Sequence, residues 1–282
     1  MVNLFRMDTY RIFRCKTFFV CLIVAFALAL GSAPFEKLLF SLGRMFVTDA
    51  TATVQASDEF TSEDAQEMEK IKNSMEFNTK ARLSDMISNP FTFLSSMLML
   101  LSVCFYFYAD VENGYIKNIA GQMPQKGFTI LSKFLAAGVH NMIFMLACVI
   151  GNIAGTLTVR HFVPDSAVVS SIGVFFLKFL LVQSICALIL LFVSTFRNKS
   201  LGTVTAVLMG LGFIMPIIYG LIDNQLINRL FKDAGEVFSK YMPDVLMGQN
   251  APDALTSVLV SVAFGGFFLL LAIRIFDRKD VK

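Results

Sequence analysis

The chain alternates between apolar blocks and polar segments. Six blocks are roughly 18–25 residues long, the length that an α-helix needs to cross about 30 Å of hydrocarbon. We therefore predict an all-α polytopic membrane protein whose six transmembrane helices form one domain over residues 1–282. The predicted spans are Phe18–Phe35, Phe91–Tyr108, Phe134–Val159, Val169–Phe196, Leu201–Ile222 and Ala254–Phe276.

Composition agrees with this pattern. The chain is 56% hydrophobic and 16% charged, whereas soluble domains average about 45–50% apolar and about 25% charged residues. The formal net charge of +3 is too small to favour nucleic-acid binding.

The positions of the basic residues predict the orientation. Cytoplasmic loops of membrane proteins carry an excess of lysine and arginine. With six spans, thirteen basic residues fall on one face, which places the N- and C-termini in the cytoplasm. They are Arg6, Arg11, Arg14, Lys16, Lys117, Lys126, Lys133, Arg197, Lys199, Arg274, Arg278, Lys279 and Lys282.

Residues 1–17 predict an amphipathic helix on the cytoplasmic surface of the bilayer. Its apolar side would carry Phe5, Ile12 and Phe13, and its basic side Arg6, Arg11 and Arg14. A solvated basic tail is the alternative. The segment also resembles a cleaved signal peptide, but Asp8 and the long stretch before the apolar run argue against cleavage.

Two polar segments are expected on the outer face, residues 43–89 and 223–253. In the first, Thr48–Ser57 predicts a loop, and Ser62–Met86 predicts an amphipathic helix whose apolar stripe packs on the spans. In the second, Ala234–Tyr241 predicts a short helix. Neither segment contains a recognisable catalytic pattern.

The sequence predicts no enzyme active site and no metal site. No G-x-x-x-x-G-K-[ST] motif is present, so the chain lacks the loop that cradles ATP phosphates in that way. The cysteines have neither C-x-x-C spacing nor histidine partners, which indicates packing residues. They are Cys15, Cys21, Cys104, Cys148 and Cys186.

Polar residues inside the predicted spans are candidates for lining a cavity, because such groups usually face the interior of a helix bundle. The candidates are His140, Asn141, Asn152, Lys178 and Gln183. A hydrogen-bonded structural role is the alternative for His140. Lys178 could instead extend its ammonium to the outer interface.

Small residues recur every fourth position in two spans, a pattern that allows close helix contact in lipid. The positions are Ala25, Ala29 and Ala33 in the first span, and Gly202, Ala206 and Gly210 in the fifth. These rows predict helix packing within the chain or contact with a second copy or a paralogue.

The polar segment 110–133 contains the sequence Glu112-Asn113-Gly114-Tyr115-Ile116-Lys117-Asn118. This E-x-G-x-I-K-N stretch resembles type-2 ABC exporter permeases, particularly those of bacterial bacitracin and lantibiotic-immunity transporters. The basic N-terminal segment, the large first outer loop and the turn Ser194–Lys199 extend the resemblance over most of the chain.

The resemblance implies that segment 110–133 docks on a separate ATP-binding subunit through a coupling helix. The implied coupling residues are Glu112, Gly114, Ile116, Lys117 and Ile119. It also implies a dimer with contacts along the first and fifth spans, a bacterial plasma-membrane location, and ATP and Mg²⁺ on the partner subunit only.

We therefore expect the permease subunit of an ABC exporter, moving an amphipathic or hydrophobic substrate such as an antimicrobial peptide or drug. Two alternatives remain: a membrane scaffold or sensor that presents segment 43–89 outside the cell, and a secondary transporter. The second is less favoured, because the predicted spans place no acid well inside the membrane.

Overall fold

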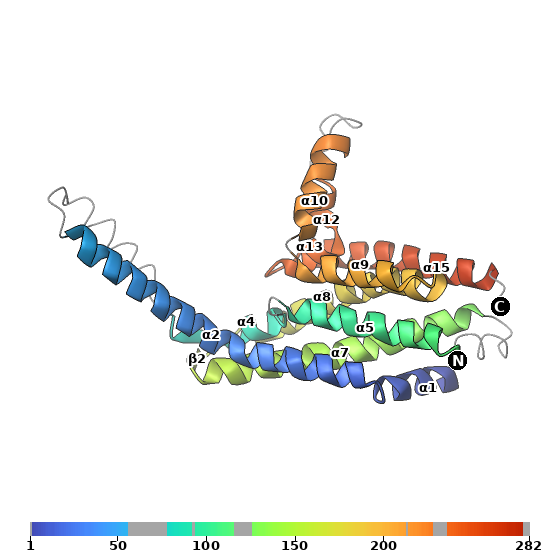
Figure 1. The fold of residues 1–282 in the computed structure, drawn as a ribbon, viewed down its shortest axis with the longest axis horizontal. Helices are drawn as coiled ribbons and strands as arrows, with labels where there is room; N and C mark the ends of the chain where they lie inside the picture. The colour runs from blue at the N-terminus through green and yellow to red at the C-terminus, as the bar shows by residue number, and fades with distance from the viewer. Residues whose placement is uncertain are drawn as a thin grey trace.

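The computed structural model describes residues 2–55, 78–91, 94–115, 126–212, 214–227 and 236–278. Within them the chain is a bundle of long helices (Figure 1). An apolar segment in lipid must satisfy its backbone hydrogen bonds internally, which a helix does. The longest elements are α2 (Lys16–Gln55), α5 (Ser95–Glu112), α7 (Gly127–Leu157), α8 (Val168–Leu190, continued by the π-helical turn η1, Leu191–Thr195) and α9 (Lys199–Leu211).

The remaining elements are shorter or interrupted. They are α1 (Val2–Ile12), β1 (Lys80–Arg82), α4 (Leu83–Ser88), β2 (His161–Val163), α10 (Ile214–Ile222), η2 (Asp223–Ile227), α12 (Phe238–Tyr241), α13 (Pro243–Gly248), α14 (Ala254–Val260), η3 (Ser261–Gly265) and α15 (Gly266–Arg278). The last three follow one another without a break and form a single long helix.

Among the described residues, four helices are long and apolar enough to cross a membrane: Lys16–Met45, Gly127–Leu157, Val168–Thr195 and Ala254–Arg278. A fifth candidate is the bent pair Lys199–Leu211 and Ile214–Gln225. The chain is therefore an α-helical membrane protein. The helix at the predicted second span, α5, is 18 residues long and ends on the acids Asp110 and Glu112. It is not among these candidates, so the predicted count of six spans is not confirmed.

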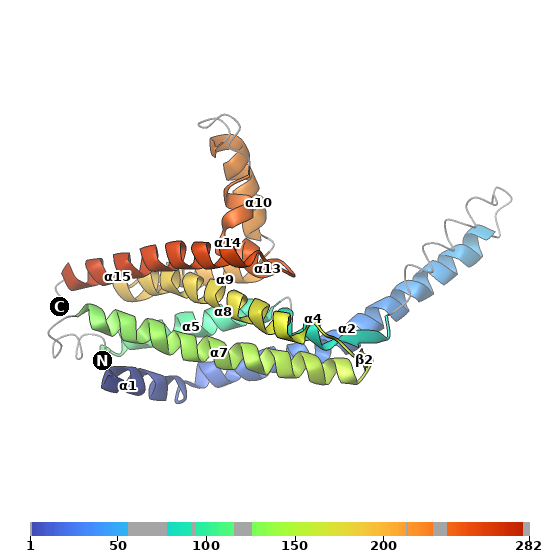
Figure 2. The ribbon, with the colours of Figure 1, turned by 180° about the vertical axis from the view of Figure 1, so that it is seen from behind.

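The helices pack in a definite order. α7 lies between α2 and α8, α5 bridges α2 and α9, and α8 contacts α13, α14 and α15 on its other side (Figure 2). α8 is the most enclosed candidate span. At one end of the bundle, α1 packs on α7 and the amide of Gly127 donates a 2.6 Å hydrogen bond to Asp277 of α15. The beginning of α1, the end of α5, the beginning of α7 and the end of α15 thus share one end of the bundle (Figure 1).

The first outer segment differs from its prediction. Residues 48–55, part of the predicted loop Thr48–Ser57, continue α2, and the stretch contains neither glycine nor proline to end the helix. Of the predicted helix Ser62–Met86, residues 62–77 lie outside the described part. Lys80–Arg82 is extended and pairs in parallel with His161–Val163, so the single predicted helix is wrong at that end, and α4 begins only at Leu83.

The predicted fifth span is not a straight helix. α9 ends at Gly212, whose φ of 68° lies in the left-handed region, and α10 leaves at a bend of 96°. The sequence draws attention to Pro216, yet Pro216 lies inside α10 and the break lies before it. Of the predicted short helix Ala234–Tyr241, the described part is helical only over α12, Phe238–Tyr241.

The N-terminal helix forms as predicted, but its buried face differs. The buried residues of α1 are Leu4, Asp8 and Ile12, whereas Phe13 is exposed. The face that packs on α7 therefore includes an acid.

Candidate functional site

The region that the resemblance assigns to coupling begins at the end of α5. Glu112 is the last residue of the helix and is exposed. The chain then turns at Gly114, where φ is 67°, a conformation that glycine adopts at little cost. The amides of Asn113 and Gly114 donate to the carbonyls of Ala109 (3.0 Å) and Val111 (3.3 Å). The other predicted coupling residues, Ile116, Lys117 and Ile119, lie outside the described residues.

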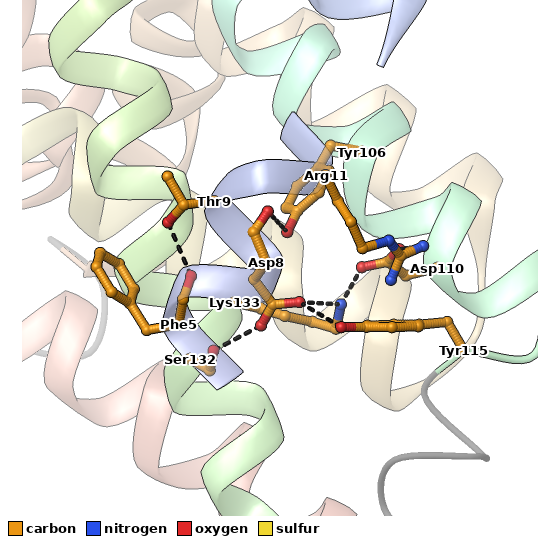
Figure 3. Close-up of polar contacts among 9 residues, drawn as sticks. All are labelled: Phe5, Asp8, Thr9, Arg11, Tyr106, Asp110, Tyr115, Ser132 and Lys133. Carbon is orange, nitrogen blue, oxygen red and sulfur yellow. Dashed lines mark hydrogen bonds and ion pairs between the residues drawn. The ribbon is translucent and has the colours of Figure 1, made fainter. Parts of the chain in front are cut away.

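Directly beside this turn lies a cluster of buried charges (Figure 3). We call it the buried charge network: Asp8 and Arg11 of α1, Asp110 of α5 and Lys133 of α7. The side chains of Asp8, Asp110 and Lys133 have 1% or less of their surface exposed. Lys133 forms an ion pair with Asp110 and lies 3.7 Å from Asp8, and Arg11 also pairs with Asp110. The network therefore joins three helices.

Hydroxyl groups complete the coordination of Asp8. Ser132 donates to one carboxylate oxygen at 2.5 Å and Tyr115 donates to the other at 3.3 Å. Tyr106 donates to the main-chain oxygen of Asp8 at 3.2 Å. The guanidinium of Arg11 stacks 3.3 Å from the centre of the Tyr115 ring, an arrangement that combines cation–π attraction with packing.

Tyr115 connects the network to the polar segment 110–133. It follows the Gly114 turn directly and sits between Asp8 and Arg11 in Figure 3. Burial, and then the neighbouring carboxylate of Asp8, raise the pKa of Tyr115 to about 12. The phenol therefore stays protonated at neutral pH and serves as a hydrogen-bond donor.

The network contains two acids and two bases, so its formal charge is balanced. Removing one member would leave an uncompensated charge among side chains of which three are almost fully buried, which is costly. Because the four groups come from α1, α5 and α7, the structure holds these helices in one mutual position.

Sequence reasoning missed the network. Asp8 entered only as an argument about signal peptides, and Lys133 only as one of the thirteen basic residues. One indication was available: Leu4, Asp8 and Ile12 are spaced by four, so they share one helix face. An acid within an apolar stripe requires a buried partner. Lys133 could not be identified as that partner from local sequence.

The predicted cavity-lining residues fall into two groups. His140 and Asn141 belong to a buried hydrogen-bonded chain: Ser102 to His140 is 3.0 Å, His140 to Asn141 is 3.1 Å, and Asn141 donates to Gln183 at 3.0 Å. Gln183 in turn donates to the carbonyl of Phe134 at 2.6 Å and borders an apolar hollow of about 440 Å³ beside α7 and α8. Both ring nitrogens of His140 therefore have a hydrogen-bond partner within the bundle.

The second group meets at Asn89, between α4 and α5. Asn152 donates to the carbonyls of Asn89 and Pro90, both at 3.4 Å. Lys178 donates to the side-chain oxygen of Asn89 at 2.7 Å. Lys178 is 2% exposed and borders a cavity of about 330 Å³. The two positions expected for its ammonium, in a cavity or at the outer interface, stay predictions.

The small-residue rows are occupied by contacts within the chain. Ala25, Ala29 and Ala33 are buried, and a Cβ placed on Gly151 of α7 would lie 2.9 Å from the Cβ of Ala29. Gly210 of α9 lies against Met97, and its carbonyl accepts from Ser96 at 2.7 Å. Ala206 is likewise buried, and Gly202 faces Val193 and Cys104. A dimer contact along these helices stays a prediction.

Across the described residues, no group of three or more histidine, cysteine, aspartate or glutamate side chains could hold a metal ion. Compared with known proteins, the chain matches no family model and no curated protein.

Proposed function

We propose that this chain is the membrane-spanning permease subunit of an ATP-driven ABC exporter, energised by a separate ATP-binding subunit at the cytoplasmic face. In this proposal α5 is the second of six spans, and the bent α9–α10 pair is the fifth. The distribution of basic residues supports a cytoplasmic position for both termini and for segment 110–133.

The observation that carries the proposal is the junction beside Gly114. The E-x-G-x-I-K-N stretch begins on the last turn of α5, and Tyr115 within it contacts the buried charge network of α1, α5 and α7. A partner that pushed on segment 110–133 would thus act on three helices through charged groups that cannot separate cheaply. That arrangement is what a coupling contact needs.

The remaining parts of the proposal rest on the resemblance and on composition. The permease would work as a homodimer or as a heterodimer with a paralogue, in the plasma membrane of a bacterium. The phenylalanine-rich, weakly charged spans suit an amphipathic or hydrophobic substrate such as an antimicrobial peptide. ATP and Mg²⁺ would bind the partner, and this chain would catalyse no reaction.

One observation favours a different class. α2 is 40 residues long, about 60 Å at about 1.5 Å per residue, and it extends well beyond the bundle (Figure 1). A scaffold or sensor that presents a rigid helix outside the cell would use this feature directly. A secondary transporter is the third candidate.

The test begins with purification of the tagged full chain from its native membrane and mass identification of co-purifying proteins. The permease proposal expects a soluble ATPase with a Walker A motif, and retention of that ATPase should be lost when Ile116 and Ile119 are both changed to serine. Recovery of the chain without any ATPase would favour the scaffold or the secondary transporter.

The second step replaces Glu112 with arginine in the reconstituted complex. We expect substrate-stimulated ATP hydrolysis to be abolished while membrane insertion and dimerisation persist. The matched control is Glu236→Arg. This substitution reverses the charge of an exposed acid that does not belong to a long helix. Unchanged stimulation in the Glu112 variant would overturn the role assigned to this residue.

A further inference from the structure

A second polar region lies away from the end of the bundle that carries α1. It is a cavity of about 330 Å³ bordered by α8, the beginning of α5, the end of α9 and α13. Its volume falls at the lower end of the range of about 300–1,000 Å³ typical of small-molecule sites. Among the residues on its wall are Asn89, Ser96, Lys178, Gly212, Asp244 and Met247.

One wall provides a buried cation. Lys178 projects from α8, is 2% exposed, and uses one of its three N–H donors on Asn89. Its other donors are available to a group within the cavity. A buried ammonium gains most from an anionic partner with hydrogen-bonding oxygens.

The other wall provides a buried acid with an unused oxygen. Asp244 of α13 is 1% exposed. One of its carboxyl oxygens accepts a 3.1 Å hydrogen bond from Tyr219. The other is buried and has no hydrogen-bond partner among the described residues. Burial raises the pKa of Asp244, and an ammonium placed beside it would favour the ionised form again.

Lys178 and Asp244 border the same cavity, yet no ion pair joins them in the described structure. Buried opposite charges that do not neutralise each other are expensive unless something lies between them. The group that fits both walls carries a negative and a positive charge of its own.

We propose that this cavity binds a zwitterionic group, with its primary ammonium at Asp244 and its phosphate or carboxylate at Lys178. Phosphoethanolamine has this chemistry, either as a free molecule or as the headgroup of a phospholipid. The assignment does not depend on the proposed transport function, because it rests on the cavity and its two charged walls.

The test measures binding to the full chain, purified in detergent, by titration calorimetry with two probes: O-phosphoethanolamine and dihexanoyl-phosphatidylethanolamine. We expect saturable binding that Asp244→Asn and Lys178→Met each weaken about tenfold or more, since each removes a charged hydrogen-bond partner. The variants Asp253→Asn and Lys240→Met remove exposed charges of the same kinds and should bind as the wild type does.

The probes also separate the two sources. Binding of both indicates that the headgroup suffices, whereas binding of the lipid alone identifies a phospholipid site. O-phosphocholine, which lacks ammonium N–H donors, should bind the wild type at least about tenfold more weakly. The comparison of O-phosphoethanolamine with O-phosphocholine uses the wild type alone, so it tests the proposal even if a substitution prevents folding. Absence of saturable binding, equal binding of phosphocholine, or equal binding by folded Asp244 and Lys178 variants would overturn the proposal.

Discussion

At the scale of single residues, the molecule keeps ionised side chains where they cannot reach water unless a helix moves. Lys133 is fully buried between Asp8 and Asp110. Its local sequence looks like that of any basic residue near the end of a span. Only the positions of α1 and α5 make it a structural centre.

Replacing Lys133 with methionine should destabilise the protein strongly. The change leaves Asp8 and Asp110 buried with Arg11 as the remaining cation, and breaking a buried pair in this way costs about 3–5 kcal/mol. The chain has no tryptophan, but Cys104, Cys148 and Cys186 are buried. A thiol-reactive fluorophore therefore reports thermal unfolding in detergent. The exposed Lys240→Met is the control, and equal midpoints for both variants would contradict the assigned role.

Asp165 provides a second prediction at this scale. It lies between β2 and α8, where hydrogen bonds from Ser84 and from the amide of Ala167 hold its pKa below the usual range. Because folding lowers this pKa, Asp165 contributes stability above its unfolded value of about 3.9. That contribution is lost as the pH falls through the lower folded value.

The unfolding temperature of the wild type should therefore fall as the pH is reduced from 6 to 3. Asp165→Asn should lower the unfolding temperature at pH 6, so that the variant loses less stability than the wild type between pH 6 and pH 3. The fluorophore reacts poorly in acid, so circular dichroism is the appropriate measurement. Asp85→Asn removes a nearby exposed carboxyl without touching these hydrogen bonds and should keep the acid-side fall. If Asp165→Asn showed the same pH dependence of unfolding as the wild type, the role assigned to the hydrogen bonds of Asp165 would be contradicted.

At the scale of elements, close packing between helices depends on where small residues lie. Gly155 of α7 faces the backbone of α2 at Leu30 so closely that a Cβ could not be accommodated without movement. Gly173 of α8 has nothing within 4 Å of the same position. The two glycines thus form a matched pair.

Gly155→Ala should destabilise the protein by about 1–3 kcal/mol, because overpacking forces the helices apart. Gly173→Ala should be neutral or slightly stabilising, since alanine favours helix over glycine by about 1 kcal/mol. Thermal unfolding with the thiol-reactive fluorophore compares the two. Similar midpoints would mean that α2 and α7 are not packed at Leu30 as the structure has them.

The helices and strands also show which parts of the fold could be predicted from the sequence. Apolar length predicted helices at all six positions, since span length is a local property. The break between α9 and α10 was not predicted, because it depends on the left-handed conformation of Gly212, which the apolar pattern of the span does not reveal. β1 could not be predicted because its partner, β2, lies 81 residues further along the chain. The small-residue rows were found, but their partners on α7 and α5 depend on the tertiary arrangement.

At the scale of the whole molecule, α1 and the end of α15 lie at one end of the bundle, and β2 lies toward the other (Figure 2). The positive-inside rule predicts that the first end faces the cytoplasm. The buried charge network lies at that end, and the site proposed for a zwitterion lies away from it.

Single cysteines in a cysteine-free background test this orientation. An impermeant maleimide applied to intact cells should label Val163→Cys and should not label Asn3→Cys or Arg278→Cys until the cells are lysed. All three positions are exposed, so differences in labelling report sidedness. Labelling of Asn3→Cys before lysis would reverse the orientation and remove segment 110–133 from the reach of a cytoplasmic ATPase.

The buried charge network also has a consequence for the order of biosynthesis. Asp8 and Ser132 are 124 residues apart, so the ribosome makes α1 long before α7 exists. Asp8 and Arg11 lack Asp110 until α5 has been made, and they lack Lys133 until α7 follows. The first helix to be translated therefore cannot be fixed in place by these charges until α5 and α7 have been made.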